Sequence, residues 1–582
     1  MERKNSESPY PVRRTSKGDE SRRYKALSKP DLHEQDAIRS VWMVSREYDG
    51  LAGAGGVKDV CRQLAEALVA HGGIAVTVLL PRYGFMDPEA AGFTPLALAD
   101  AQERSWCGDR EQESLVVEMD YPDRERRERV AFWQRRERGV RLILAESPRF
   151  AEKQAVYTYT AGEERQTPWK KRGQGHIDYF AMNILLQKAA LALLCRLDER
   201  PDVLHCHDGH AATLAPLARE LPGHRHFFAQ SGILVTIHNA GIGYHQDVAD
   251  LPFARAITGL PASVIKKGLL NNSFDPFVAA APYAVLNTVS ENYARELQET
   301  DADARTGWLG HHLLKMGVQL AGVTNGINPR DFDPTRPGQL GIAAAFDPGR
   351  GDLAGKRVCK EDILSDCAGS GSWQKVVQSG SLSPDPELPL YTFVGRITAQ
   401  KGVDVLLRAL DLLPEAARLQ VLVLGSGDPA IERQLIDVSG QRDPRFFLCY
   451  LRGYDPVLAN RIYAAGDFFL IPSLYEPCGL TDYIAQLLGN LPIVHLVGGL
   501  VKVVDGETGF GYQPHTPAAL ARTMERARRI YTTEPETIRT MQRAAVNRIH
   551  RYHTWKRVMG RYLELYEQAR RRACGQVAGD HG

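Results

Sequence analysis

Short hydrophobic runs alternate with amphipathic segments along most of the chain. The runs are rich in β-branched residues and bounded by polar or glycine-containing stretches, which is typical of buried strands. They lie at residues 40–45, 74–81, 140–147, 201–208, 232–239, 388–396, 419–428, 446–455, 467–473 and 491–499. Helical patterns lie between them, as at 57–72, 177–198 and 403–413. Alternation of this kind predicts an α/β protein with parallel sheets.

A break in the pattern divides the chain into two halves. Residues 326–390 are rich in Gly, Pro, Asp and Ser, which is typical of a connector, with one short helix near 355–365. The closing segment has a helical pattern with aromatic anchors at Trp555, Tyr562 and Tyr566. We therefore expect two Rossmann-like domains with a cleft between them, over residues 37–345 and 346–545, and a C-terminal helix over 546–582.

Composition excludes several classes of protein. The 582 residues carry a formal net charge of +2, which predicts neither a nucleic-acid partner nor a membrane partner. Residues 1–30 hold nine Lys and Arg against four Asp and Glu, with no apolar run, so we expect a disordered basic tail over 1–36. The nine cysteines are scattered without a CxxC pair, which favours reduced thiols and a cytoplasmic location.

The loop GAGGVKDV (53–60) follows the first predicted strand and opens the first helix. Paired glycines such as Gly55 and Gly56 let a backbone approach a phosphate or a sugar at a helix N-terminus. The same glycines also serve close packing of strand on helix, so both interpretations stay open.

Two acidic or histidine-rich loops raise the question of a metal. HCHDGH (205–210) has histidine spacing that can ligate zinc, although polar residues facing a substrate at a strand end fit better. The acid-x-acid loop DAD (301–303) lies in a polar run, and we interpret it as solvated surface. We therefore predict no metal site.

Two loops of the second half carry groups suited to a nucleotide. VGRITAQKG (394–402) places Arg396 and Lys401 in one strand-to-helix loop, where two cations suit a diphosphate, although both can be ordinary surface residues. Glu476 follows the run DFFLIP and precedes a helix start, so it either caps that helix or faces a ligand.

Six separated motifs together resemble one family. EPCGLT (476–481), RITAQKG (396–402), TIHN (236–239), HCHDGH (205–210), TVSENYAREL (288–297) and TNGINPRDFDP (324–334) have the order and spacing of bacterial glycogen synthases and plant starch synthases. The resemblance runs from about residue 40 to the closing helix. It implies the GT-B fold, with two Rossmann-like domains and a last helix that crosses back to the first.

The resemblance also implies an activity. Members of this family transfer glucose from ADP-glucose or UDP-glucose to the non-reducing end of an α-1,4-glucan, with retention of configuration. The expected partners are therefore a nucleotide-sugar donor and an α-glucan acceptor such as glycogen or maltodextrin, with no metal and no organic cofactor. Oligomeric state is not predicted. No carboxylate pair suggests a retaining glycosidase, and nothing resembles the pyridoxal phosphate site of glycogen phosphorylase.

The residues that match the family motifs are implied to form the site. Arg396 and Lys401 would hold the diphosphate, and Glu476 would bind the donor glucose. Tyr454 would stack on the base. The implied catalytic residues are Glu476, Arg396, Lys401, His238 and Asp208, and the implied substrate-binding residues are Gly55, Gly56, Asp59, Asn325, Tyr454, Cys478, Gly479, Leu480 and Thr481.

Two loops depart from the family pattern. Gly53 stands where the family loop KTGGLADV has a lysine, and Lys58 is a new cation five residues later. HLVGGLVKVV (495–504) replaces the family stretch RRTGGLADTV. Two interpretations follow: an active synthase with a rebuilt donor loop, or a non-catalytic relative that binds glucan or nucleotide. Retention of Arg396, Lys401 and Glu476 favours the first.

Overall fold

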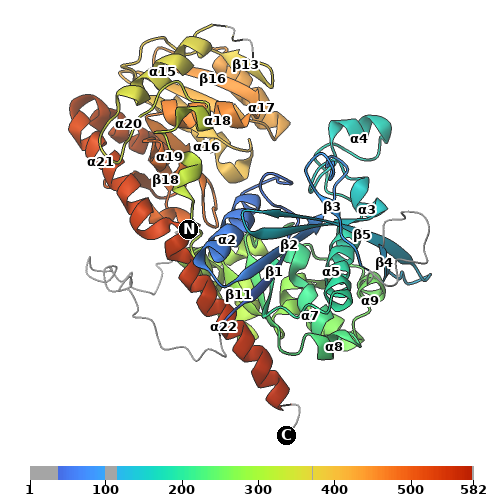
Figure 1. Ribbon diagram of the computed structural model, residues 1–582. Helices are drawn as coiled ribbons and strands as arrows, with labels where there is room; N and C mark the ends of the chain where they lie inside the picture. The colour runs from blue at the N-terminus through green and yellow to red at the C-terminus, as the bar shows by residue number, and fades with distance from the viewer. Residues whose placement is uncertain (1–36, 99–113, 370, 372, 580–582) are drawn as a thin grey trace, which may run out of the picture. The chain divides into compact units, whose positions relative to one another are not determined.

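Two mostly parallel sheets with helices on their faces make up the structure (Figure 1). The computed structural model describes residues 37–98, 114–369, 371 and 373–579. The basic tail predicted over 1–36 lies outside the described residues. The predicted α/β architecture is confirmed.

The first sheet has the strand order β12-β11-β8-β7-β1-β2-β6-β5-β3, with β4 paired to β5. Pairing is parallel from β12 to β6 and antiparallel where β5 joins β6, β4 and β3. The strands are β1 (Ser40–Val44), β2 (Ala75–Pro81), β3 (Thr94–Pro95), β4 (Ser114–Glu118), β5 (Arg127–Glu137), β6 (Val140–Glu146), β7 (Val203–His207), β8 (Gly232–Ile237), β11 (Val285–Thr288) and β12 (Ala321–Gly322). A separate hairpin pairs β9 (Leu269–Leu270) with β10 (Ser273–Phe274).

Amphipathic helices cover this sheet. Helix α2 buries Val60, Cys61, Leu64 and Leu68, a spacing that places all four on one face. The principal helices of this part are α2 (Val57–His71), α4 (Ala161–Gln166), α5 (Tyr179–Arg196), α6 (Gly209–Ala212), α7 (Leu214–Glu220), α9 (Leu251–Thr258), α11 (Pro276–Ala280), α12 (Glu291–Glu299) and α13 (Leu309–Lys315).

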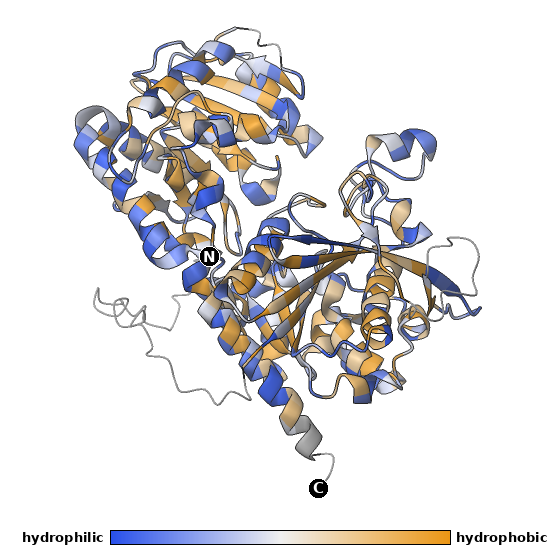
Figure 2. Ribbon diagram, viewed as in Figure 1, coloured by the Kyte–Doolittle hydropathy of each residue, from blue (hydrophilic) through white to orange (hydrophobic). Residues whose placement is uncertain are grey.

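The second sheet has the order β13-β16-β15-β14-β17-β18-β19, parallel except where β13 joins β16. Alternate residues of its strands enter two separate cores. Val421 and Val423 belong to one core, and Leu422 and Leu424 to the other, so both faces are buried. Figure 2 shows the resulting apolar strands between more polar helices. The strands are β13 (Val376–Gly380), β14 (Leu390–Val394), β15 (Leu419–Gly425), β16 (Phe446–Gly453), β17 (Phe468–Ile471), β18 (Leu491–His495) and β19 (Phe510–Tyr512).

Helices again connect these strands. The helix predicted near 355–365 is longer, because α15 spans Ala354–Cys367. The other principal helices are α16 (Val403–Asp411), α17 (Pro429–Ser439), α18 (Pro456–Ala465), α19 (Thr481–Leu487), α20 (Pro517–Thr533) and α21 (Pro535–Arg548).

The closing helical segment is interrupted where the chain returns to the first sheet. A π-helical turn, Ile549–His553, follows α21, and Thr554 is extended before α22 (Trp555–Gly579) begins. The extended residue pairs with Ile327, whose N–H donates to the His553 carbonyl at 2.8 Å. Beyond this point α22 packs against β8 and α2 (Figure 1). The predicted crossing of the last helix back to the first domain is confirmed. The prediction of one uninterrupted helix from residue 546 is wrong, because the chain leaves the α-helical conformation over residues 549–554.

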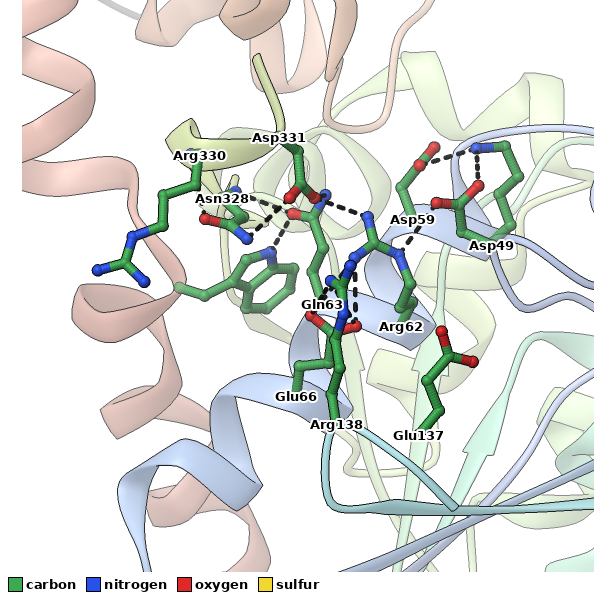
Figure 3. Close-up of polar contacts among 12 residues, drawn as sticks. Asp49, Asp59, Arg62, Gln63, Glu66, Glu137, Arg138, Asn328, Arg330 and Asp331 are labelled. Carbon is green, nitrogen blue, oxygen red and sulfur yellow. Dashed lines mark hydrogen bonds and ion pairs between the residues drawn. The ribbon is translucent and has the colours of Figure 1, made fainter. Parts of the chain in front are cut away.

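Polar side chains of α2 tie both connections to the first domain (Figure 3). The Gln63 Oε1 accepts hydrogen bonds from the Asn328 N–H at 2.9 Å and from the Trp555 indole N–H at 2.7 Å. Arg62 donates to Asp331 at 2.7 Å and to Asp49 at 3.0 Å. The helix that opens with the GAGG loop is therefore fixed to both crossing segments.

Candidate active site

Asp208 lies where β7 ends and α6 begins. Its backbone has φ of +58°, a conformation that side-chain-bearing residues rarely adopt and that often marks functional sites. Its Oδ1 accepts the backbone N–H of His238 at 2.6 Å and that of Asn239 at 3.3 Å. These contacts join the carboxyl ends of β7 and β8.

Burial controls the protonation of Asp208. Loss of water raises its pKa to about 8, although the two backbone N–H groups oppose the rise. The carboxyl group is therefore largely neutral at pH 7. A group in that state is suited to hydrogen bonding rather than to nucleophilic attack.

His238 follows β8 and stands against His207 of β7. The Nδ1 atom of His207 lies 2.9 Å from the Nε2 atom of His238, and the rings are stacked. Burial lowers the pKa of both imidazoles, that of His207 to about 3. Both rings are therefore neutral. His205, two residues earlier, bonds Tyr566 of α22 and Thr236 instead.

Lys401 and Glu476 meet at the corresponding edge of the second sheet. Lys401 ends a short 3-10 turn after β14, and its Nζ lies 2.6 Å from Glu476 Oε2. Ser473, after β17, donates to the same oxygen at 3.0 Å. The Glu476 side chain is only 12% exposed. Burial favours the protonated form, but Lys401 and Ser473 hold the pKa of Glu476 below its usual value, so it is ionised.

Arg396 is exposed in the same loop as Lys401. Its guanidinium donates to the Tyr244 hydroxyl at 3.2 Å and to Gln400 at 3.4 Å. Tyr244 belongs to the first domain, so this arginine joins the two halves of the site. Its weak neutral partners leave its charge available for an anion.

The turn from Cys478 to Thr481 is shaped by the loop that departs from the family pattern. Gly479 has φ of +75°, and Thr481 begins α19. Lys502 donates to the carbonyls of Cys478 and Gly479 and lies 3.1 Å from Asp482. Burial raises the pKa of Asp482 to about 6 despite this lysine.

A second residue of that loop also packs on the turn. A Cβ on Gly498 would lie 1.9 Å from the Glu476 carbonyl oxygen, so only glycine fits there. The Gly499 N–H donates to this same oxygen at 2.9 Å. The rebuilt loop therefore fixes the backbone on which Glu476 and Cys478 lie.

The GAGG loop reaches the same region from the first domain. A Cβ on Gly56 would lie 3.3 Å from Leu480, which places the start of α2 against the 478–481 turn. The N–H groups of Ala54 and Gly55 donate to Glu47 Oε2 at 2.7 and 3.1 Å. Glu47 therefore orders the loop, and a Cβ on Gly55 would meet nothing within 4 Å.

Lys58 lies over Gly53. A Cβ on Gly53 would be 2.2 Å from the Lys58 Cδ, so the lysine stem fills the space that a side chain at 53 would use. Its Nζ lies 2.8 Å from both Asp49 and Asp59. Two carboxylates therefore neutralise this cation, and Asp59 is engaged in the same cluster (Figure 3).

Asn325 and Tyr454 complete the predicted set. Asn325 is buried, and its Oδ1 has no hydrogen-bond partner among residues 37–98, 114–369, 371 and 373–579. Its backbone N–H lies near the Cys478 thiol, whose pKa burial raises to about 11. Tyr454 follows β16 and is 60% exposed, which leaves its ring accessible for stacking.

Sequence reasoning missed the residues that support this set. Glu47, Ser473 and Lys502 contact the predicted residues through the fold, and no local motif singles them out. For Lys502 the departure of the 495–504 loop was a usable signal.

Within the described part of the chain, no group of three or more His, Cys, Asp and Glu side chains is arranged to hold a metal ion. The DAD interpretation was wrong for Asp303. That carboxylate is buried and accepts the N–H groups of Gly310 at 3.1 Å and His311 at 2.9 Å, so it caps a helix.

No helix within the described ranges is both long and apolar enough to cross a membrane.

Two protein families match the two parts of the chain. Residues 40–315 match the starch synthase catalytic domain, and residues 389–529 match glycosyl transferases group 1. The gap between the matches, residues 316–388, overlaps most of the segment predicted as connector.

Curated relatives match almost the whole chain. A glycogen synthase of Aeromonas salmonicida (strain A449) is 30% identical over 91% of this chain and 98% of its own length. A glycogen synthase of Anaeromyxobacter dehalogenans (strain 2CP-1) is 31% identical over 90% of this chain and 98% of its own.

A solved structure agrees with these matches. The catalytic domain of starch synthase IV from Arabidopsis thaliana, bound to ADP and acarbose, superposes with a TM-score of 0.71 and 25% identity. The match covers 92% of this chain and 99% of that one. The predicted resemblance and the GT-B fold are confirmed, and the chain belongs to the glycogen synthase family of glycosyltransferases.

Proposed function

We propose that this protein transfers glucose from ADP-glucose to the non-reducing end of an α-1,4-glucan, with retention of configuration. The observation that carries the proposal is the ion pair of Lys401 and Glu476, 2.6 Å apart at the carboxyl ends of β14 and β17. Ligands of open α/β sheets bind at this edge. The starch synthase structure with ADP and acarbose supports the choice of donor and acceptor.

In this proposal the second domain holds the donor. Arg396 and Lys401 neutralise the charge that grows on the departing diphosphate, and the start of α2 adds the partial positive charge of its free N–H groups. Glu476 accepts a hydrogen bond from the donor glucose. Tyr454 stacks on the base, and the Cys478–Thr481 turn holds the sugar phosphate.

The first domain faces the reaction centre. Asp208, His238 and Asn325 supply hydrogen bonds to the sugar, and Gly55 and Gly56 let it approach closely. With Asp208 neutral and Glu476 engaged by Lys401, neither carboxyl serves as a nucleophile. We therefore assign front-face displacement, in which the leaving phosphate accepts the proton of the attacking hydroxyl and positioning supplies most of the rate.

In this proposal, turnover needs no metal and no organic cofactor. The acceptor domain covers residues 37–345, the donor domain 346–545 and the returning helix 546–582. A cytoplasmic location stays a prediction.

The test is transfer of radiolabelled glucose to glycogen with purified protein, ADP-glucose or UDP-glucose, and excess EDTA. We expect incorporation from ADP-glucose, released by enzymes that cleave α-1,4 linkages. Glucan binding without incorporation from either donor would instead identify a non-catalytic relative. Activity that EDTA abolishes would refute the metal-free chemistry.

A further inference from the structure

His207 lies directly behind His238 in the wall of the site. Strands β7 and β8 are paired, with His207 opposite Thr236, so His238 emerges beside it just beyond the strand. The two ring nitrogens are 2.9 Å apart. His238 retains 7% of its surface exposed, whereas His207 retains none. His207 therefore touches no substrate and acts only through its neighbour.

One hydrogen is shared between the facing nitrogens. Because both rings are neutral, each carries a single N–H. Either His207 donates from Nδ1 to His238 Nε2, or His238 donates from Nε2 to His207 Nδ1. The first arrangement leaves the His238 hydrogen on Nδ1, and the second leaves a bare acceptor there.

The other ring nitrogen of His207, Nε2, decides between these two arrangements of the hydrogen. This atom is buried and has no hydrogen-bond partner in the described part of the chain. If His207 accepts from His238, its own hydrogen sits on this nitrogen as a buried N–H without an acceptor. If His207 donates, the nitrogen is only a bare lone pair. Orphaned buried N–H groups are the rarer defect in folded proteins.

We propose that His207 is a positioning residue that donates its Nδ1 hydrogen to His238 and thereby makes His238 an N–H donor toward the substrate. The role of His238 in the site rests on the proposed function. The assignment of the hydrogen does not, because it follows from the two rings alone. A neutral donor at this place binds a sugar or phosphate oxygen and cannot act as a general base.

His205 provides a matched control on the same strand. It is as buried as His207, but both of its nitrogens have partners, the Tyr566 hydroxyl at 3.0 Å and the Thr236 hydroxyl at 2.8 Å. Its hydrogen bonds anchor α22 and β8 and do not reach His238.

The test is two-bond proton–nitrogen NMR of the protein labelled with ¹⁵N-histidine, with His238 assigned from a His238→Gln spectrum. We expect the wild-type hydrogen of His238 on Nδ1. His207→Leu removes the donor, so the hydrogen redistributes toward Nε2, and kcat falls about tenfold, the worth of one hydrogen bond. His205→Leu loses similar packing but keeps the Nδ1 hydrogen.

His207→Asn keeps an N–H close to the position of Nδ1. This variant should retain the Nδ1 hydrogen of His238 and a kcat within about threefold of wild type, and it carries the test if His207→Leu does not fold. A hydrogen on Nε2 in the wild type, or on Nδ1 in His207→Leu, overturns the proposal. Absence of turnover would sink the proposed function, yet the spectra would still report the tautomer.

Discussion

The charge state of Asp208 links the chemistry of the site to protein stability. Its folded pKa of about 8 lies above the value of about 4 expected in the unfolded chain. The folded state therefore binds the proton more tightly. The resulting stabilisation is complete below pH 4 and is lost as the pH rises to 8.

Replacement by asparagine should remove this pH dependence. Between pH 5 and 8 the wild-type free energy of unfolding should fall by up to about 1.4 kcal/mol per pH unit because of this group. Asp208→Asn should lack that component and be the more stable protein at pH 8. Denaturant titrations at several pH values measure the difference, and parallel curves for the two proteins would contradict the raised pKa.

Substitution of Arg396 should change activity alone, whereas substitution of Lys401 should change both activity and stability. Arg396 is exposed and its contacts are weak, so Arg396→Ala should lower kcat/KM about tenfold or more through loss of a charged hydrogen bond. Its melting temperature should not change. Lys401→Ala removes the cation that pairs with the buried Glu476 carboxylate, so we expect about 1–3 kcal/mol of lost stability as well.

A double variant separates the two effects of Lys401. Lys401→Ala combined with Glu476→Gln removes the unpaired charge and should recover the melting temperature but not transfer. Recovery of transfer would show that the lysine acts only by neutralising Glu476.

Lys58 is unsuited to replace a cation at position 53, because Asp49 and Asp59 already engage its Nζ. Lys58→Ala should therefore change the donor KM less than about twofold. Gly53→Lys forces the Lys58 stem to move, since the new Cβ would meet it at 2.2 Å. The double variant Gly53→Lys/Lys58→Ala has no such conflict and should lower the donor KM. A large rise in KM for Lys58→Ala would identify it as a donor ligand.

At the scale of elements, apolar runs were predictable and mixed ones were not. Runs such as 74–81 and 491–499 correspond to β2 and β18, because strands buried on both faces are continuously hydrophobic. Strand β5 was missed because only Val130 and Phe132 of its eleven residues are fully buried among arginines and glutamates. The extended Thr554 was missed because its partner, Ile327, is remote in sequence.

The 498–502 segment acts as one element on the Cys478–Thr481 turn. Lys502 holds the carbonyls of Cys478 and Gly479, so Lys502→Met should loosen the turn and raise the donor KM several-fold, about 1 kcal/mol. Asp482, deprived of its cation, should bind a proton more tightly. Lys171→Met is the matched control, because Lys171 pairs with Glu164 on the surface, away from this turn. An unchanged KM in Lys502→Met would refute the role of the loop.

At the scale of the whole molecule, the roles of the site residues were predictable only through resemblance. Motifs identify Asp208, Glu476 and Lys401 as candidates, but their protonation and pairing depend on burial and on partners from other elements. Spacing along the chain contains neither. Rossmann-like halves, by contrast, follow from local alternation of strands and helices.

The returning helix makes the first domain dependent on the last residues of the described chain. Tyr562 and Tyr566 of α22 are fully buried in the core of the first sheet. In the sequence, all strands of the second sheet lie between that sheet and α22. Tyr562→Ala should cost about 3–5 kcal/mol through the cavity it leaves. Because the tyrosine packs on the first core, hydrogen exchange should accelerate in β7 and β8 before β15 and β16. Met524, buried in a core of the second sheet, supplies the control. Met524→Ala should reverse the order, and equal acceleration of both sheets in both variants would show that the domains unfold as one unit.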